Sequence, residues 1–320
     1  MKINISNPII IFVFVLFVIL SSSCKQDLGI DSQQLENDNL ATYIKSHAIK
    51  VQPSADGLYF IPLSSGATNG LSITKSTDCI LFDYAALNIN DHVYDSSIPV
   101  IAAINKDSFP LLKYGGPRII QMNVYQSPYG LVEGFGKMKE GDSAEFIIPS
   151  TLWNNDFNTR IYLVKLKKVI PDIYAYEKDL IKNFLDTCKA NANPKLEPKD
   201  STTTPENVTG VYYIETLKGD GSNNPIVGDS VDISYKAKTI NGSYFDSALH
   251  LKTLIGTQHF IPGFEAGVKH MKSGGKAIII VPFRQGYGSI TVTDPNTGQI
   301  IIQSWSTLVF EVTLNIIKKN

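Results

Sequence analysis

Side chains that could ligate a metal or act as nucleophiles are scattered along this 320-residue chain. Cys79 and Cys188 lack the neighbouring His that a thiol nucleophile needs, and we expect both to be free, buried thiols. The net charge of −1 gives no electrostatic reason to expect nucleic acid as a partner. We expect neither a metal nor a cofactor, because no two of the histidines sit at a convincing ligand spacing next to a cysteine or carboxylate: His47, His92, His250, His259 and His270.

A short helix bracketed by glycines occurs twice, and its residues point to a different kind of site. In FIPGFEAGVKHMKSGG (260–275) a Pro-Gly breaker precedes Phe264, Val268 and Met271, which lie at helical spacing. SPYGLVEGFGKMKEGD (127–142) repeats this arrangement with Leu131 in the place of Phe264. The two copies therefore predict one structural element with two different apolar side chains at one position.

The segments around these helices also recur in order. GLYFIPLSSG (57–66) is echoed by GVYYIETLKG (210–219), and YAALNINDHVYDSS (84–97) aligns without a gap with YKAKTINGSYFDSA (235–248). Both copies continue with a strand that ends in Pro and close on an alternating strand, a pattern typical of antiparallel sheets with one face on a core. An ordered series of matches indicates an internal duplication. We predict an α+β protein in which each copy is a curved antiparallel sheet wrapped around one short helix.

The first residues have the pattern of a targeting segment. A basic start is followed by an apolar run of about a dozen residues, which is short for a spanning helix and typical of a signal peptide. The small residues before Cys24 resemble a bacterial lipoprotein signal, although Ser21 stands where Leu is usual. We expect lipidation at Cys24 and a lipid anchor in the cell envelope of a bacterium, with the outer membrane favoured and the protein facing the periplasm or the surface. An uncleaved anchor and a signal cut elsewhere are the alternatives.

Composition divides the rest of the chain. Residues 1–23 are the predicted signal peptide, 24–41 a polar tether and 42–170 the first domain. Residues 171–204 hold a helix with one apolar face and then a Pro/Thr-rich linker, and 205–320 form the second domain.

The second copy resembles the FKBP family of peptidyl-prolyl cis-trans isomerases over about residues 205 to 318. The resemblance lies in several motifs that follow one another in the family order. These are GDGSNNPIVGD, Tyr235 followed by Phe245-Asp246-Ser247, FIPGFEAGVKHM, VPFRQGYG and LVFEV. It implies two FKBP-like domains, of which the second is an isomerase that acts on proline-containing polypeptide clients.

The resemblance also implies a proline pocket. Phe264 would form its floor, where the family usually has Trp, and Leu251 stands where the family has a further aromatic wall. The backbone N–H of Ile261 would hold a substrate carbonyl, with polar contacts from the side chains of Tyr287 and Asp246. The catalytic residues would be Tyr235, Phe245, Asp246, Ile261, Phe264, Tyr287 and Phe310, and the substrate-binding residues Leu251, Phe260 and Ile302. Rotation about an X-Pro bond makes and breaks no covalent bond, so such a site requires no nucleophile.

The first copy departs further from the family and predicts a degenerate domain. It keeps Tyr84, Tyr94 and Asp95, but Leu131 replaces the aromatic floor, and the Tyr-Gly loop with its long flap is missing. The flap of the second copy lacks the family's prolines. These departures leave a second hypothesis open, a non-catalytic peptide-binding or scaffold lipoprotein. A carbohydrate-binding β protein is a third, although two tryptophans in the chain do not favour it.

Overall fold

The computed structural model describes residues 31–98, 101, 116–123, 125, 127–191, 198–199, 210–221, 223–257, 259–296 and 300–318. The predicted signal peptide and Cys24 lie outside these described residues, as does most of the predicted Pro/Thr-rich linker. The chain divides into two units, Met1–Ile49 and Lys50–Asn320.

In the first unit the described residues form one helix, α2 (Ser32–Ser46). The Asp31 carboxylate caps it by accepting a hydrogen bond from the N–H of Gln33 at 3.0 Å. At the other end the His47 ring stacks on Tyr43 with the ring centroids 3.9 Å apart. The helix therefore begins inside the segment that the composition assigns to a polar tether.

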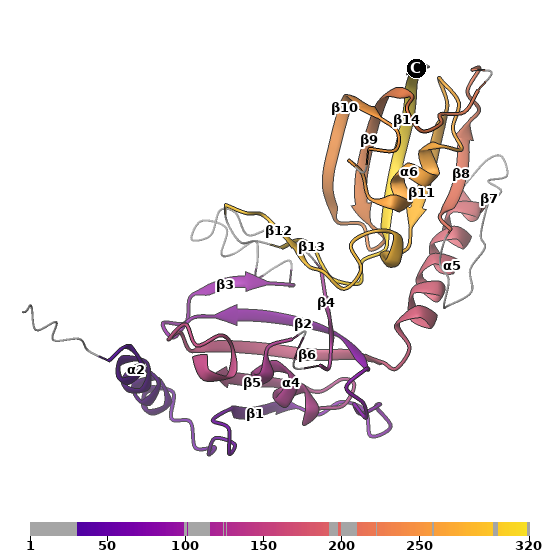
Figure 1. Cartoon of the computed structure of the whole chain (residues 1–320). Coiled ribbons are helices and arrows are strands. Elements are labelled where there is room, and N and C mark those ends of the chain that lie inside the picture. The colour runs from indigo at the N-terminus through magenta and orange to yellow at the C-terminus, as the bar shows by residue number, and fades with distance from the viewer. Residues whose placement is uncertain are drawn as a thin grey trace, which may run out of the picture. The chain divides into compact units, whose positions relative to one another are not determined.

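The second unit contains two antiparallel sheets with the same strand order (Figure 1). In the first sheet the order is β1-β5-β6-β2-β3, and the short strand β4 also pairs with β2. The elements of this half are β1 (Tyr59–Ser64), β2 (Cys79–Leu87), β3 (Val93–Ser96), β4 (Arg118–Gln121), α4 (Tyr129–Gly136), β5 (Ser143–Ile148), the 3₁₀ turn η1 (Ser150–Leu152) and β6 (Arg160–Ile170).

In the second sheet the order is β8-β11-β14-β9-β10, with β7 paired to β8 at its edge. A small hairpin of β12 and β13 follows the turn η2. The elements are α5 (Ile173–Asn191), β7 (Pro198–Lys199), β8 (Tyr212–Leu217), β9 (Ser230–Thr239), β10 (Tyr244–Leu254), α6 (Pro262–Val268), β11 (Lys276–Val281), η2 (Phe283–Gln285), β12 (Val292–Thr293), β13 (Ile300–Ile302) and β14 (Leu308–Lys318).

The strand register confirms the predicted fold of two matching α+β domains. Tyr162 on β6 lies opposite Phe146 on one side and Ala86 on the other. Phe310 on β14 lies in the same way between Ile279 and Ala237. Tyr162 and Phe310 are therefore equivalent positions, and the same register pairs Tyr84 with Tyr235.

The glycines of the duplicated helix allow it to lie close against its sheet. A Cβ added at Gly263 would come within 2.4 Å of Val281, and one at Gly267 within 2.4 Å of Ile279. In the first domain a Cβ at Gly130 or Gly134 would meet β5 at 2.4 and 2.6 Å. Such distances are far below van der Waals contact, so each copy needs glycine at both positions for the helix to pack on its strand, β5 in the first domain and β11 in the second.

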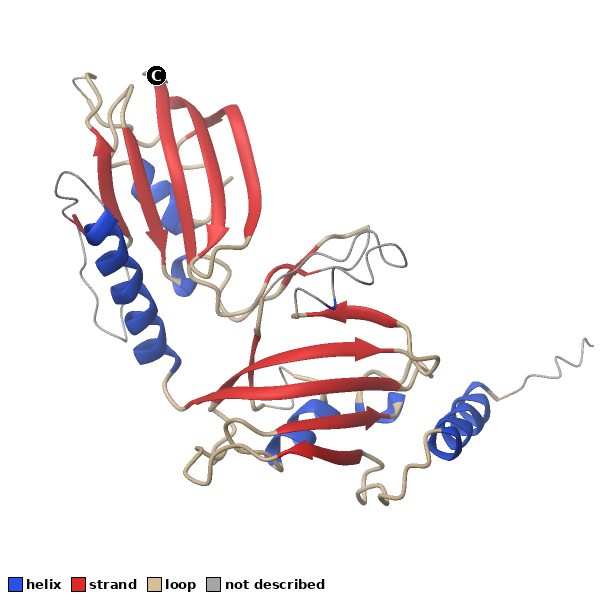
Figure 2. Ribbon diagram, turned by 180° about the vertical axis from the view of Figure 1, so that it is seen from behind, coloured by secondary structure: helices blue, strands red, loops and turns tan. Residues whose placement is uncertain are grey.

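Each domain has its own apolar core between its short helix and its sheet, and Figure 2 shows these helices on one face of each sheet. In the second domain Phe264, Val268 and Met271 of the helix region are buried against the sheet. Side chains alternate between the faces of a strand, so the opposite face of this sheet presents a second apolar set. Helix α5 packs there, and the buried members of this cluster are Ile181, Tyr212, Ile214, Ile280 and Val309.

Candidate active site

Five aromatic rings meet in the second domain between helix α6 and the sheet. Phe264 lies at the centre, with its ring centroid 4.7 Å from that of Phe310, 4.8 Å from Phe260 and 5.6 Å from Tyr235. Phe245 adds an edge-to-face contact with Phe310 at 6.2 Å. Phe264 is 1% exposed, whereas Tyr235, Phe245 and Phe260 are only partly buried. The cluster thus has a buried base and an outer layer of rings that reach solvent.

A tyrosine and a carboxylate form a hydrogen-bonded pair at the border of this cluster. The hydroxyl of Tyr235 on β9 donates to Asp246 on β10 at 2.5 Å. Burial raises the pKa of Tyr235, and the bond to Asp246 raises it further, so the phenol stays protonated and keeps its donor. Tyr287, which follows η2, is 36% exposed, and burial and the charge of Asp246 raise its pKa as well.

At the start of helix α6, the backbone N–H of Ile261 is a donor available to a ligand as far as the described part of the chain shows. Ile261 is the N-cap residue, and its carbonyl accepts from the N–H groups of Phe264 and Glu265. Its own N–H has no acceptor among the described residues. The structure thus places an available amide beside the rings of Phe260 and Phe264.

The flap, residues 288–303, supplies the predicted Ile302 and also two apolar contacts, from Val292 and Ile301, that the sequence analysis did not identify. Its strands β12 and β13 form a hairpin in which Val292 lies opposite Ile302. Ile302 is buried, and Val292 and Ile301 pack against the same core as the rings. The signal was present in the sequence, since apolar residues flank the turn DPNTG on both sides.

Leu251 lies farther along β10, opposite Ile233, and is partly buried.

Two open hollows occur on the same sheet. One, of about 650 Å³, is lined by Phe245 and Asp246 of the predicted site and by Lys236, Tyr244 and Ser247.

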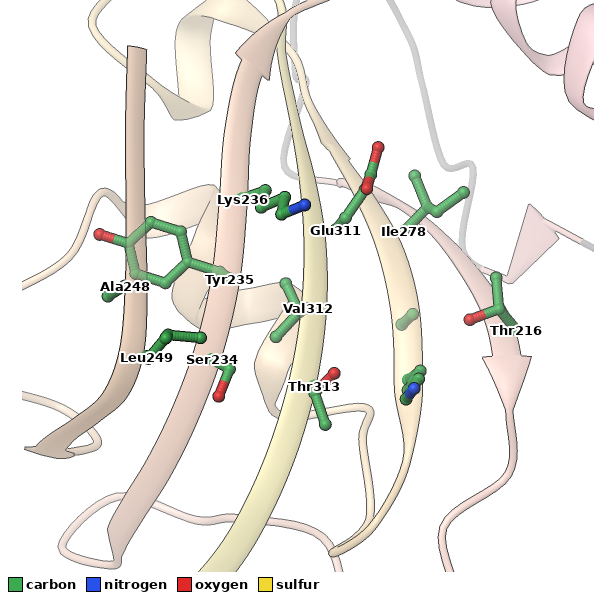
Figure 3. Close-up of a pocket in the computed structure, with 12 residues that line it drawn as sticks. Thr216, Ser234, Tyr235, Lys236, Ala248, Leu249, Ile278, Glu311, Val312 and Thr313 are labelled. Carbon is green, nitrogen blue, oxygen red and sulfur yellow. The ribbon is translucent and has the colours of Figure 1, made fainter. Parts of the chain in front are cut away.

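The other hollow, of about 390 Å³, shares only Tyr235 with the predicted site (Figure 3). In Figure 3 the side chain of Tyr235 extends from β9 toward Ala248 on β10. Apolar and polar residues line the rest of this hollow, and Lys236 and Glu311 bring charges of both signs to it. The rings around Phe264 form a distinct site from this surface.

The first domain repeats the hydrogen-bonded pair but surrounds it differently. The hydroxyl of Tyr84 donates to Asp95 at 2.6 Å. Tyr84 is only 3% exposed, and burial followed by the charge of Asp95 raises its pKa. Leu131 is buried at the position of Phe264. Arg118 occupies the register position of Leu251, because it lies opposite Phe82 as Leu251 lies opposite Ile233, and its guanidinium lies 5.6 Å from the centre of the Tyr84 ring.

A tryptophan covers the first domain's equivalent of Phe310. Trp153, just after η1, stacks on Tyr162 with the ring centroids 5.4 Å apart, and the Arg160 guanidinium lies 4.9 Å from the Trp153 ring centre. In the second domain the chain after η2 runs instead into Tyr287 and the flap. The ring neighbours of Phe310 in the described part of the chain are Tyr235, Phe245 and Phe264.

The described residues offer little for other kinds of chemistry. Cys79 and Cys188 are free, but only Cys79 is buried as expected, because Cys188 is partly exposed. Burial raises the pKa of the Cys79 thiol to about 12, so it is not a reactive thiolate. No cluster of three potential metal ligands occurs within the described ranges. Within the same ranges no helix combines the length and the apolar character that crossing a membrane requires.

Comparison with known proteins agrees with this site. The family model of the FKBP-type peptidyl-prolyl cis-trans isomerases matches residues 221–315, which include all the predicted residues of the proline pocket. The FK506-binding protein 1A of Aspergillus fumigatus is 36% identical over 100 residues, which cover 30% of this chain and 84% of that protein. The chain belongs to the FKBP-type peptidyl-prolyl cis-trans isomerases.

Two further FK506-binding proteins support the same assignment. The FK506-binding protein 1 of Rhizopus delemar is 36% identical over 106 residues, covering 32% of this chain and 93% of the relative. The FK506-binding protein of Neisseria meningitidis is 30% identical over 109 residues, covering 33% of this chain and 94% of the relative. Among solved structures, FkpA from Escherichia coli is 26% identical with a TM-score of 0.33, over 46% of this chain and 62% of that one.

Proposed function

We propose that the cluster of five rings centred on Phe264 forms the proline pocket of this isomerase and that catalysis takes place in the second domain. The observation that carries this proposal is the arrangement of these rings around a buried phenylalanine, beside the Tyr235–Asp246 pair and the free Ile261 N–H. All of them lie within the residues that match the family.

An apolar ring cluster suits rotation about an X-Pro bond. The rotation breaks amide resonance against a barrier of ~18–20 kcal/mol. The planar amide is more polar than the twisted one, so an apolar site from which water is excluded disfavours the ground state relative to the transition state. Aromatic rings contribute large, rigid areas to such a site. A rate gain of ~10⁵ would require only about 7 kcal/mol of differential binding.

The polar groups at the border would orient the substrate. The Ile261 N–H would donate to a carbonyl of the bound peptide and fix its direction. Asp246 holds the Tyr235 hydroxyl, so the Tyr235 ring keeps one orientation against Phe264. Tyr287 would add a hydroxyl at the solvent side. None of these groups needs to transfer a proton.

The first domain, on this proposal, is FKBP-like in fold but degenerate in its site. Leu131 replaces the central ring, Arg118 introduces a charge at the wall, and Trp153 covers Tyr162. Such a domain would serve to hold a partner, to dock the second domain or to space it from a membrane.

We further propose that the isomerase works outside the cytoplasm on proline-containing polypeptides, anchored to a bacterial membrane through a lipid on Cys24. The support is the short apolar run that ends in small residues and Cys24. Cys24→Ser should leave an unprocessed precursor and abolish labelling by a fatty-acid probe. Labelling of this variant at the wild-type level would refute the anchor.

A non-catalytic, peptide-binding lipoprotein is the second candidate, and the replacement of two usual aromatics by Phe264 and Leu251 favours it. The two candidates differ in turnover. Exchange spectroscopy on an X-Pro peptide, with the whole chain at catalytic concentration, should show faster cis-trans exchange than the peptide alone. Peptide binding with uncatalysed exchange would support the second candidate instead.

A further inference from the structure

A buried carboxylate on helix α5 lies outside the residues that match the family and contacts the base of the active-site turn. Glu177 is 6% exposed and shares the inward face of α5 with Ile181, Phe184 and Leu185. A carboxylate at this depth requires hydrogen-bond donors, because its burial without them would be costly. Both of its donors come from the second domain.

One oxygen of Glu177 joins the two segments that hold the flap. Its Oε1 accepts from the backbone N–H of Phe283 at 2.7 Å and from the hydroxyl of Thr307 at 2.6 Å, and both bonds are buried. Phe283 begins the turn η2, from which the flap leaves the core. Thr307 directly precedes β14, through which the chain returns after the flap. The carboxylate therefore fixes the beginning and the end of the flap to one point.

Backbone hydrogen bonds continue this attachment to Tyr287. The carbonyl of Phe283 accepts from Gly286 at 3.0 Å and from Gly288 at 2.8 Å, so Tyr287 lies inside a turn closed on Phe283. The carbonyl of Gly288 in turn accepts from Trp305 at 2.8 Å. Movement of the Phe283 backbone would thus shift Tyr287 and both sides of the flap together.

The rings on this side add a second set of contacts. Tyr174 on α5 stacks on Phe283 with centroids 5.5 Å apart, and Trp305 meets the same ring edge-to-face at 5.1 Å. The Arg284 guanidinium lies 4.3 Å from the Tyr174 ring centre and donates to its hydroxyl. The first turns of α5 therefore make both polar and aromatic contacts with η2.

We propose that Glu177 is a positioning residue of the isomerase site, holding the Tyr287 turn and the return of the flap in place from helix α5. This inference rests on the proposed function of the ring cluster. It makes α5 part of the catalytic unit, because the helix orients the turn whose Tyr287 would contact the substrate on that proposed function. Glu177 itself contacts no substrate.

The test compares single variants of the full chain in a Trp153→Phe background, which leaves Trp305 as the sole fluorescent tryptophan. Glu177→Ala removes both bonds, whereas Glu177→Gln keeps an amide oxygen that can accept them. Thr307→Val removes one bond at nearly constant volume. Ile181→Ala is the matched control, because it loosens the packing of the same helix without removing either bond.

We expect kcat/KM for an X-Pro peptide to fall about 10-fold in Glu177→Ala and about 3-fold in Thr307→Val. Glu177→Gln should recover to within about 2-fold of wild type, and Ile181→Ala should lower Tm yet keep kcat/KM while folded. Trp305 emission should shift in Glu177→Ala and not in Glu177→Gln.

Wild-type kcat/KM and unchanged Trp305 emission in folded Glu177→Ala would overturn the proposal. If Glu177→Ala does not fold, the proposal is tested with Thr307→Val and Glu177→Gln instead. Wild-type turnover in Thr307→Val would then overturn the proposal. If the parent chain itself does not accelerate exchange, the proposed function fails, whereas the Trp305 emission still tests the positioning role.

Discussion

The two halves of this molecule share a sheet order, a glycine-bracketed helix and a tyrosine–aspartate hydrogen bond, yet they differ in what surrounds that bond. In the second domain Tyr235 is partly exposed and belongs to a cluster of rings around Phe264. In the first domain Tyr84 is buried beneath Arg118, and Trp153 lies on Tyr162. The same framework thus carries a cluster of partly exposed rings in one copy and a buried tyrosine beside an arginine in the other.

This difference separates the fold from the activity. The glycines and the strand order, which the two copies share, position the helix against the sheet. The retained Tyr–Asp pair fixes one ring in each domain. On our account neither is sufficient for isomerisation, because the reaction needs rings that a proline can reach and a surrounding from which water is excluded.

The largest effect is expected from the tryptophan that covers the first domain's site. Trp153→Ala removes a half-buried ring and should destabilise the fragment 42–170 by about 2 kcal/mol in urea unfolding. The exposed Phe157→Ala serves as its control and should cost far less. In the full chain Trp153→Ala should add no isomerase activity, since Leu131 and the missing flap remain. A gain in activity would mean that the covering ring alone separates the two domains.

Replacing the central ring of the second domain by the first domain's residue is the next test. Phe264→Leu should lower kcat/KM about 10-fold, equivalent to ~1.4 kcal/mol in the barrier, because the smaller side chain leaves gaps beside a proline ring. The cost in stability should be about 1 kcal/mol, since the exchange is apolar for apolar. Turnover and Tm are measured on the same samples. Wild-type turnover in a normally melting variant would contradict the role of Phe264.

The two carboxylates of the Tyr–Asp pairs provide a matched comparison. Asp246→Ala should lower kcat/KM about 3-fold, or ~0.7 kcal/mol, because the Tyr235 ring loses its fixed orientation. Asp95→Ala should leave turnover unchanged but cost about 1–2 kcal/mol of stability, since it leaves the buried Tyr84 hydroxyl without its acceptor. Equal losses of turnover in the two variants would show that the first domain also takes part in catalysis.

The smallest effect is expected from the ionisation of Glu177, the buried carboxylate bonded to turn η2 of the second domain. Burial raises the folded-state pKa of Glu177, while its bonds to Thr307 and Phe283 and the charge of Arg284 oppose this. A raised carboxyl pKa means that the wild type loses stability as pH rises from the unfolded pKa through the folded one. The Tm of Glu177→Gln minus that of wild type should therefore be a few °C larger at pH 8 than at pH 4. A constant or reversed difference would contradict the direction of this pKa shift.

The fold could be predicted from the sequence because the duplication repeats features with strict geometric requirements. Gly130 and Gly263 recur because no side chain fits between helix and strand, and such positions are visible as spacing. Alternating apolar residues predicted the antiparallel strands for the same reason, since strand side chains point to opposite faces. The predicted ring residues of the site also fall on neighbouring elements in the structure.

Other features could not be predicted because they depend on contacts distant in sequence. The insertion after Ser97 breaks the alignment of the copies, so the equivalence of Arg118 and Leu251 becomes visible only in the strand register. Glu177 looks like an ordinary helical acid, and its burial depends on donors more than a hundred residues away. The one hint was its place on the apolar face of the helix, four residues before Ile181.

The most direct test of the central claim compares the two domains as separate fragments, residues 42–170 and 171–320, in the same X-Pro exchange measurement. The second fragment keeps α5 and its contacts with Phe283 and Thr307. Our account predicts that both fragments melt cooperatively, that 171–320 accelerates exchange as the full chain does, and that 42–170 leaves it at the uncatalysed rate. Two results would contradict it. One is that 42–170 accelerates exchange as much as 171–320 does, and the other is that neither fragment accelerates exchange although the full chain does.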